Sequence, residues 1–392
     1  MTVYLDYNAT SPLCDAARDA VYAVVDGDAG NPSSLHLPGQ RARRHLDAAR
    51  RRVATALGGS PGEVTFTSGA SEANHLGLRG HAHYLQRAGS VRDDGAPPVA
   101  LISALEHPSM VAASDCLSAL GWRVVELSVG SDGRIRPETV TAALERDQVS
   151  LIALLAVNNE LGVCQPIAQI AALTRARGVT LLCDATQALG RITVNVKAWG
   201  VDLLTLSGHK IGGLAGSGAL WVRAGVGCDP LFAGHQEQGL RAGTENVAGA
   251  VALGAACTAL EGRLADGDRI RDLRDRLWQG IGALLPNALR NGSEEAAHET
   301  GQTLNVSFAG VEAATLVMAL DLEGIAVSAG AACSSGTLEP ARAVLAIGDG
   351  SAAWLGRARS AVRFSFGPGN SDADVERVLA VLPALVERCH AR

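Results

Sequence analysis

A lysine at the end of a strand-like run is the residue of this sequence best suited to covalent chemistry. Lys210 closes the stretch 203–210, in which an apolar run leads into Ser207 and His209. The sequence holds one other lysine, Lys197, and its remaining strong bases are arginines. A lysine amine can lose its proton when it is desolvated and can form a Schiff base with an aldehyde, which a guanidinium cannot do. Lys197 is typical of a solvated lysine, and Lys210 taken alone fits either role equally well.

Two further features supply groups that an aldehyde cofactor bound to a lysine would need. Asp184 follows the strand-like residues 179–183, where its carboxylate can hold a protonated pyridine nitrogen. The strand-like residues 63–67 run into Ser68-Gly-Ala-Ser71 and then into a helix, an arrangement whose backbone N–H groups bind phosphate. Both features have ordinary alternatives, because Asp, Ser and Gly are also common helix caps. Together with Lys210, they favour a pyridoxal phosphate site.

Three other residues have types that fit a reaction on such a cofactor. His107 precedes a helix, where its ring can stack on the cofactor or move a proton, although a lone histidine is more often a polar loop residue. Cys333 lies in a loop of small residues, 328–336, whereas most other cysteines lie in apolar elements. We expect this loop to be mobile and its thiol exposed, as a nucleophile requires. Arg363, in a strand-like run, can bind a carboxylate through two parallel hydrogen bonds or form a surface ion pair.

The composition indicates a globular α/β protein and argues against several classes of function. Of the 392 residues, 19% are charged, and the formal net charge is −6 with no basic block, which disfavours nucleic acid as a ligand. No basic segment followed by an apolar one opens the chain, and no apolar run reaches the roughly 20 residues of a membrane span. The eight cysteines form no C-x-x-C pair, so we expect no metal site, no disulfide framework and a reduced, cytoplasmic protein.

The order of strand-like and helix-like segments predicts a mainly parallel sheet with helices on both faces. Between residues 63 and 222 the two kinds of segment alternate, as they do in crossover units. Ligands bind beyond the carboxyl ends of such strands, and the polar residues of interest follow the predicted strands there. The glycine-rich run 212–218 precedes a strand and not a helix, so we do not interpret it as a dinucleotide-binding loop.

A long helical region separates two predicted domains. We expect a large cofactor-binding domain over residues 15–260 and a small α+β domain formed by residues 1–14 and 261–392. Helical patterns cover 247–265 and 268–285, and strands are predicted at 303–308, 326–328 and 362–366. The small domain then carries the Cys333 loop and Arg363.

Six motifs resemble those of the cysteine desulfurases of the NifS/IscS type, which are class V aminotransferase-like enzymes of pyridoxal phosphate fold-type I. In order, they are Phe66-Thr-Ser-Gly-Ala-Ser-Glu72, Val157-Asn-Asn-Glu-Leu-Gly162, Asp184-Ala-Thr-Gln187, Ser207-Gly-His-Lys210, Arg241-Ala-Gly-Thr244 and Ser328-Ala-Gly-Ala-Ala-Cys333. The resemblance extends over nearly the whole chain. It implies a seven-stranded type of sheet, a homodimer, and conversion of L-cysteine to L-alanine with transfer of the sulfur to an acceptor protein.

The resemblance also implies a role for each candidate residue. Lys210 holds the cofactor as a Schiff base and moves protons, Asp184 pairs with the pyridine nitrogen, and His107 stacks on the ring. Cys333 attacks the substrate sulfur and carries it as a persulfide. The other implied contacts are Gln187 and Asn159 at the ring hydroxyl; Ala70, Ser71, Ser207, His209 and, from the partner subunit, Thr244 at the phosphate; and Arg363 with Asn31 at the substrate carboxylate.

Departures from the family pattern leave the sulfur acceptor open. Ser71 stands where threonine is usual, and Ile211-Gly-Gly-Leu-Ala-Gly216 stands where many members have a Gly-Pro pair. The chain ends at Arg392, soon after its last predicted helix, without the longer tail by which housekeeping members bind a scaffold protein. The alternative functions are a selenocysteine lyase, another class V reaction such as transamination, and a non-catalytic sulfur carrier. The pathway served also stays open: iron–sulfur cluster assembly, nitrogen fixation, or thiolation of tRNA or DNA.

Overall fold

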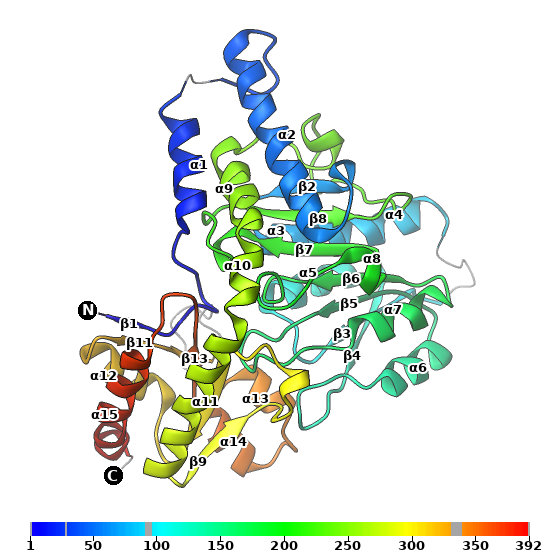
Figure 1. The fold of residues 1–392 in the computed structure, drawn as a ribbon. Coiled ribbons are helices and arrows are strands. Elements are labelled where there is room, and N and C mark those ends of the chain that lie inside the picture. Colours follow the sequence, from blue (N-terminus) through cyan, green and yellow to red (C-terminus); the bar gives the residue numbers. More distant parts are fainter. Residues whose placement is uncertain (1, 28–29, 91–95, 331–338, 391–392) are drawn as a thin grey trace.

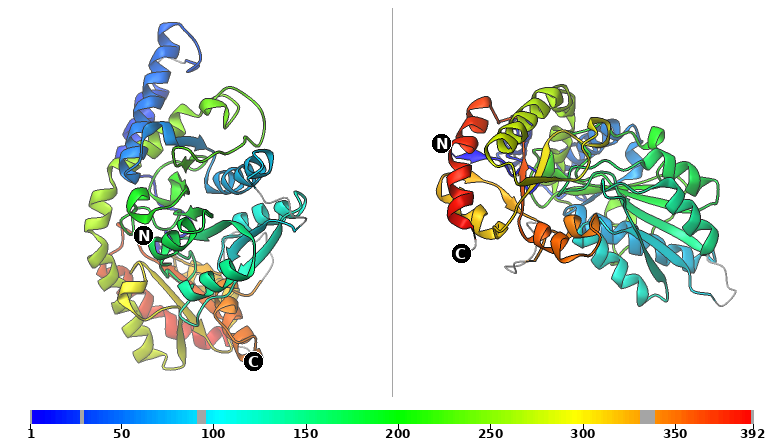
Figure 2. Two further views of the ribbon diagram at one scale, coloured as in Figure 1. Left: turned by 90° about the vertical axis from the view of Figure 1, so that its right-hand side faces the viewer. Right: turned by 90° about the horizontal axis from the view of Figure 1, so that it is seen from below.

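A large and a small assembly of sheets and helices make up the molecule, a computed structural model that describes residues 2–27, 30–90, 96–330 and 339–390 (Figure 1). The large sheet fills one half. The smaller sheets lie in the other half, where both ends of the chain are found (Figures 1 and 2).

The large sheet has seven strands and confirms the expected α/β fold with a mainly parallel sheet. In spatial order the strands are β2 (Val64–Thr67), β8 (Gly218–Val222), β7 (Leu203–Ser207), β6 (Thr180–Asp184), β5 (Val149–Leu155), β3 (Val99–Ser103) and β4 (Arg123–Leu127). Strand β8 is antiparallel to both of its neighbours, and the other pairs are parallel. The carboxyl ends of the parallel strands therefore meet at one edge, which is where such sheets bind ligands.

Helices cover both faces of this sheet. They are α1 (Asp15–Val25), α2 (Leu37–Leu57), α3 (Ala70–His75), α4 (His81–Arg87), α5 (Pro108–Ser118), α6 (Pro137–Arg146), α7 (Ile167–Arg175), α8 (Val196–Trp199) and α9 (Val247–Thr258). One apolar cluster joins α2, α7 and α9 to the sheet through side chains such as Leu46, Ile170 and Leu253. A second cluster includes Leu76 and Met110 and packs the region of α3 and α5 against the sheet. The inner strands β3, β6 and β7 are buried on both faces and are mostly apolar for that reason.

The second half is built on antiparallel strands. A four-stranded sheet has the order β12 (Ser328–Ala329), β13 (Ala361–Ser365), β10 (Thr303–Phe308) and β9 (Ala288–Asn291), and β1 (Val3–Tyr4) pairs with β11 (Ile325–Ala326). The helices of this half are α10 (Leu260–Ala265), α11 (Gly267–Leu284), α12 (Ala313–Leu322), α13 (Arg342–Ala346), α14 (Ala352–Arg359) and α15 (Asp372–Cys389). Val3 and Leu5 belong to the apolar cluster of this half. The division into 15–260 on one side and 1–14 with 261–392 on the other stays our proposal, which these separate cores support.

Several short elements differ from the sequence-based prediction. The helix predicted over 247–265 is divided at Ala259 into α9 and α10. The strand predicted at 326–328 is two strands, because β11 pairs with β1 whereas β12 pairs with β13. The pattern did not indicate β9, α13 or α14, which are too short to show a reliable period.

Two observations bear on cross-links and membranes. Within the described residues, Cys14, Cys116, Cys164, Cys183, Cys228, Cys257 and Cys389 are free thiols. None of the helices in this part of the chain has both the length and the apolar character that crossing a membrane requires.

Candidate active site

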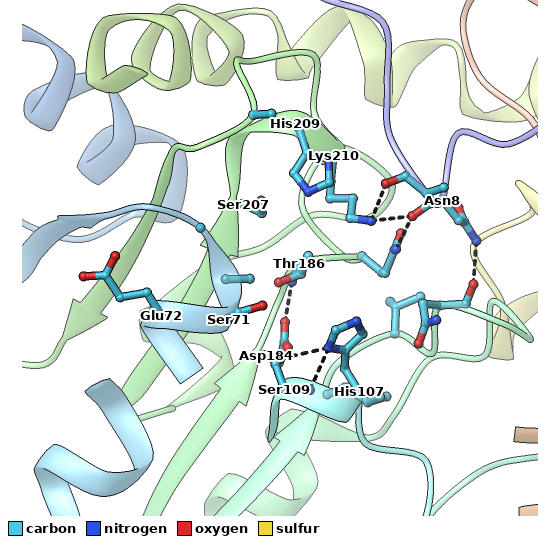
Figure 3. A pocket seen from close by; sticks show the side chains of 18 of the residues that line it. Asn8, Ser71, Glu72, His107, Ser109, Asp184, Thr186, Ser207, His209 and Lys210 are labelled. Carbon is cyan, nitrogen blue, oxygen red and sulfur yellow. Dashed lines mark hydrogen bonds between the residues drawn. The ribbon is translucent and has the colours of Figure 1, made fainter. Parts of the chain in front are cut away.

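A cavity of about 310 Å³ opens beyond the carboxyl ends of β5, β6 and β7 (Figure 3). The last residues of these strands, Leu155, Asp184 and Ser207, form part of its wall. The cavity also brings together most of the other predicted site residues, namely Lys210, Gln187, Asn159, Ala70, Ser71, His209, His107 and Arg363. Because these residues are far apart in the sequence, the fold is what assembles them.

Lys210 is held both by its strand and by the N-terminal segment. It closes a single 3₁₀ turn, η3 (Gly208–Lys210), that follows β7 directly. Its Nζ donates hydrogen bonds to the backbone oxygens of Asn8 and Ala9, each at 2.7 Å (Figure 3). Its own backbone oxygen accepts a hydrogen bond from Ser11 Oγ at 2.9 Å. The amine therefore lies in the cavity at a defined position.

Asp184 is a buried carboxylate at the end of β6. Its Oδ2 accepts a hydrogen bond from Asn74 Nδ2 at 2.9 Å, and its Oδ1 accepts one from the backbone N–H of Thr186 at 2.9 Å. Asn74 is in turn fixed by Thr205, whose Oγ1 donates to Asn74 Oδ1 at 2.6 Å. These two donors fix the direction of the carboxylate.

His107 is the N-cap of α5, and its ring is held in one orientation. Its Nδ1 lies 2.8 Å from Ser109 Oγ and accepts a hydrogen bond from the Ser109 backbone N–H at 3.1 Å. Burial lowers the pKa of His107, and the charge of Lys210 lowers it further, although Asp184 opposes them. The ring is therefore neutral at neutral pH. With Nδ1 accepting, its proton is on Nε2.

Glu106 is a buried acid next to His107. Its Oε1 accepts hydrogen bonds from Ser103 Oγ at 2.6 Å and from the backbone N–H of Leu155 at 2.9 Å. Burial raises its pKa to about 8, with the charge of Asp184 contributing in the same direction and these hydrogen bonds opposing. The Glu106 carboxyl is therefore protonated at neutral pH and adds no negative charge behind Asp184.

One end of the cavity has the features of an anion site. Ala70 and Ser71 open α3, where the first backbone N–H groups of a helix are available to a ligand. The acidic residue in this turn, Glu72, is paired with Arg241, whose Nε donates to its Oε1 at 2.8 Å. Its side chain points away from Lys210 (Figure 3). The carboxylate of Glu72 is thus neutralised and does not oppose an anion.

His209 also lines the cavity and is uncharged at neutral pH. Its Nδ1 is 3.1 Å from Thr10 Oγ1. Burial, together with the charge of Lys210, lowers its pKa to about 4. The ring can therefore offer a neutral N–H to a bound group.

Two buried oxygen atoms in the cavity wall lack a hydrogen-bond partner within the described residues. They are Thr186 Oγ1 and Gln187 Oε1. The amide nitrogen of Gln187 is used, because Nε2 donates to the backbone oxygen of Asn8 at 2.9 Å. Since buried polar atoms are nearly always hydrogen-bonded in proteins, this part of the wall suits a polar ligand.

Arg363 reaches the cavity from β13, in the other half of the molecule. Its side chain is buried, with 1% of the residue exposed. Nη2 donates to Asp6 Oδ1 at 2.7 Å and Nη1 donates to the backbone oxygen of Asn159 at 3.0 Å. Its Nε has no partner among the described residues. The sequence left open a surface ion pair for Arg363, and its burial excludes that interpretation.

Two predicted site residues of the described part of the chain do not line this cavity. Thr244 lines a neighbouring cavity of about 180 Å³ that shares Ser68 and Gly216 with it. Asn31 lies between α1 and α2, where its Oδ1 accepts a hydrogen bond from the backbone N–H of Ser33 at 2.9 Å. Cys333, and the mobility expected for its loop, lie outside the described residues.

Three residues that hold the site were not identified from the sequence: Asp6, Asn8 and Asn74. Asn74 lies on the helix after the Ser-Gly turn, at a buried position where an apolar residue is usual, and that was an available signal. Asp6 and Asn8 act through contacts with residues more than 150 positions away, which no local pattern shows. Within the described part of the chain, no group of three or more His, Cys, Asp or Glu side chains is arranged to hold a metal ion.

Comparisons with known proteins agree with this geometry. The model of the aminotransferase class-V family matches residues 3–378. A cysteine desulfurase IscS of Clostridium botulinum is 33% identical over 388 residues, which cover 98% of this chain and 94% of that protein. Among solved structures, a NifS-like protein has a TM-score of 0.88 at 28% identity and covers 99% of this chain and 100% of its own. The structure of SspA in complex with cysteine has a TM-score of 0.79 at 28% identity. The match covers 94% of this chain and 100% of the SspA chain. With nearly the whole sequence matched and the expected fold observed, the chain belongs to the class-V aminotransferase family.

Proposed function

We propose that this protein is a pyridoxal phosphate-dependent cysteine desulfurase that converts L-cysteine to L-alanine and carries the sulfur on Cys333 as a persulfide. The observation that supports it most strongly is the shared cavity of Lys210, Asp184 and Arg363. An amine, a buried carboxylate and a guanidinium are the groups that hold the aldehyde, the ring nitrogen and an amino-acid carboxylate. The relatives named cysteine desulfurase, and the complex of SspA with cysteine, support cysteine as the substrate.

The cavity fits pyridoxal phosphate. The turn before α3, with Ala70 and Ser71, supplies N–H and hydroxyl donors for the phosphate, and Ser207 and His209 add further donors. Asp184 would hold the ring nitrogen, and His107 would stack on the ring. Gln187 and Asn159 would contact the ring hydroxyl, and Gln187 Oε1 has no other partner among the described residues. When bound, the cofactor withdraws electrons from the substrate and so makes the Cβ–S bond easier to break.

Three residues of the chain have separate roles toward the substrate. Arg363 binds the carboxylate of L-cysteine, with Nε available and with Asp6 fixing the other end of the guanidinium. Lys210 moves the proton at Cα. The Cys333 thiolate attacks the substrate sulfur, an S–S bond forms on Cys333, and the Cβ–S bond breaks. The electron pair of that bond stays on the amino-acid fragment, which takes up protons and becomes alanine.

We further propose a homodimer with a sulfur-acceptor protein as its partner. Thr244 lies outside the cavity of its own chain, which supports its assignment to the site of a second subunit. Neither nucleic acid nor a membrane is a proposed partner. The free thiols support the cytoplasm as the compartment. Iron–sulfur cluster assembly is one of the pathways that such a donor can serve.

The test is to mix the purified protein with L-cysteine and to measure alanine and protein persulfide together, for wild type and Cys333→Ala. We expect the wild type to form both products and the variant to form neither. If both proteins form alanine equally, Cys333 is not the sulfur acceptor, and a lyase or transaminase reaction replaces the proposal. Competition between equal concentrations of cysteine and selenocysteine distinguishes a desulfurase from a selenocysteine lyase.

A further inference from the structure

The contact between Lys210 and the N-terminal segment has a geometry that a free lysine amine can satisfy and a Schiff-base nitrogen cannot. Two backbone oxygens, those of Asn8 and Ala9, each lie 2.7 Å from Nζ. A protonated lysine has three N–H donors, whereas a lysine nitrogen bonded to a cofactor aldehyde has at most one. The carbonyl pair therefore matches Lys210 in the stage of the reaction in which substrate has replaced it on the cofactor.

The carbonyl of Asn8 is held in place from both halves of the molecule. Asn8 is buried, and its Nδ2 donates to Thr303 Oγ1 at 2.8 Å and to the backbone oxygen of Asn159 at 3.0 Å. Its backbone N–H donates to Ser365 Oγ at 3.0 Å. The side chain of Asn8 thus spans the loop after β5 and strand β10. Any movement of these elements changes the position of the carbonyl.

Arg191 is a buried cation that donates a hydrogen bond to the side chain of Asn8. Its Nη2 donates to Asn8 Oδ1 at 3.2 Å, and its Nη1 donates to the backbone oxygen of Gln187 at 3.0 Å. Its Nε donates to Gln302 Oε1 at 2.9 Å. In the described part of the chain, the acceptors of its hydrogen bonds are neutral oxygens. Burial, with the nearby charges of Arg263 and Arg363, lowers the pKa of Arg191 to about 9. Burying a cation among neutral acceptors costs free energy, so the presence of Arg191 here indicates that it has a specific role.

We propose that the backbone oxygens of Asn8 and Ala9 form a docking site for the Lys210 ammonium, and that Arg191 is a positioning residue that fixes this site through Asn8. The proposal rests on the proposed function, because docking is needed only if Lys210 leaves a cofactor during turnover. The docked ammonium keeps its proton at Nζ inside the cavity, ready for transfer. The site also couples Lys210 to the small half of the molecule through Asn8.

The chain is well suited to a direct test, because Lys197 and Lys210 are its only lysines. The purified protein with its cofactor is treated with aminooxyacetate, which captures the cofactor aldehyde and releases Lys210. Trace acetylation with acetic anhydride follows over a range of pH. Mass spectrometry then gives the acetylation of Lys210 relative to the exposed Lys197, which serves as an internal reference.

In the wild type we expect a low ratio near neutral pH that rises to a plateau in alkali, because the two carbonyls favour the charged amine. Asn8→Ala and Arg191→Ala loosen the docking site and raise the neutral-pH ratio about tenfold, the change in deprotonated fraction that one pH unit gives. Arg191→Lys keeps a hydrogen-bond donor, so we expect its neutral-pH acetylation ratio to lie between those of the wild type and Arg191→Ala. Asn287→Ala, at an exposed asparagine, matches the wild type and is the control for substitution.

The proposal is overturned by an Asn8→Ala profile that matches the wild type, or by a wild-type ratio near one at every pH. Poor access without docking gives a low ratio that does not rise with pH, which also overturns it. If Asn8→Ala does not fold, the acetylation profiles of the wild type and Arg191→Lys test the proposal, and identical profiles overturn it. The visible absorption of cofactor bound to lysine separates the two proposals. A protein without that absorption contradicts the proposed function, whereas its Lys210 profile is still measured.

Discussion

The two sides of the cavity are made in different ways. On one side, Asp184 is the last residue of β6 and Lys210 closes the short turn after β7, so that local structure places each group. On the other side, Arg363 is held by Asp6, a residue 357 positions away in the chain. The groups for cofactor chemistry thus depend on local structure in the large sheet. The groups for the carboxylate and for the lysine amine depend on how the two halves of the molecule meet.

The largest effect is expected from the strand-end side. Lys210→Ala removes the amine that we propose binds the cofactor and moves protons, and should lower alanine formation by at least about 10²- to 10⁴-fold. After borohydride reduction, the mass of the wild type should increase by one bound cofactor and that of the variant should not. Lys197→Ala, an exposed lysine outside the cavity, is the control and should retain both properties. Cofactor fixed covalently to Lys210→Ala contradicts the assignment.

The side formed by long-range contacts should show a smaller effect, mainly on substrate binding. Arg363→Ala removes charged hydrogen bonds of about 1.5–3 kcal/mol each, so we expect kcat/KM for cysteine to fall about 10²-fold. Asp6→Asn keeps the shape next to Arg363 but not the charge, and should raise KM less than Arg363→Ala does. Steady-state kinetics of the two variants measures this order. An unchanged KM in Arg363→Ala means that Arg363 does not bind the carboxylate.

The buried acid Glu106, next to His107, should make the stability of the protein depend on pH. The folded-state pKa of Glu106 is about 8, above its ordinary value of 4.5. Between these values the folded protein keeps a proton that the unfolded chain has released, so this group lowers stability as pH rises, by at most about 1.4 kcal/mol per pH unit. Glu106→Gln removes this dependence and should gain stability relative to wild type from acid to alkaline pH. Urea unfolding at several pH values tests it, and parallel pH profiles contradict it.

The smallest effect is expected far from both sides of the cavity. Arg377 donates to Glu323 at 2.9 Å, and both side chains are exposed. Such surface pairs contribute about 0–1 kcal/mol. Arg377→Ala should therefore change the free energy of unfolding by less than about 1 kcal/mol and leave kinetics unchanged. A larger loss in urea unfolding would show that α12 and α15 depend on this pair.

The groups at the strand ends were easier to predict from the sequence than the groups held by long-range contacts. Asp184 and Lys210 were identifiable because an apolar strand-like run leads directly to a polar residue, and the observed β6 and β7 end at or next to them. Asn74 was missed because one polar residue in a helix carries no sign of its partner. The break at Ala259 was missed because the residues on both sides have helical patterns. The roles of Thr244 and Asn31 stay predictions, since neither residue lines the cavity. The role of Cys333 stays a prediction because that residue lies outside the described part of the chain.

By itself, the sequence determined the succession of strands and helices, the turn residues after each strand, and the chemical types available for the site. These depend on short-range periodicity and on the backbone preferences of nearby residues, which a single chain displays openly. Only the tertiary structure decided that Asn8 accepts from Lys210, that Arg191 lies behind Asn8, and that Asp6 holds Arg363. These contacts require the N-terminal strand to pair with β11 in the small half and then to cross to the large sheet. Pairing over such distances is set by the burial of two complete cores, so no local pattern can express it.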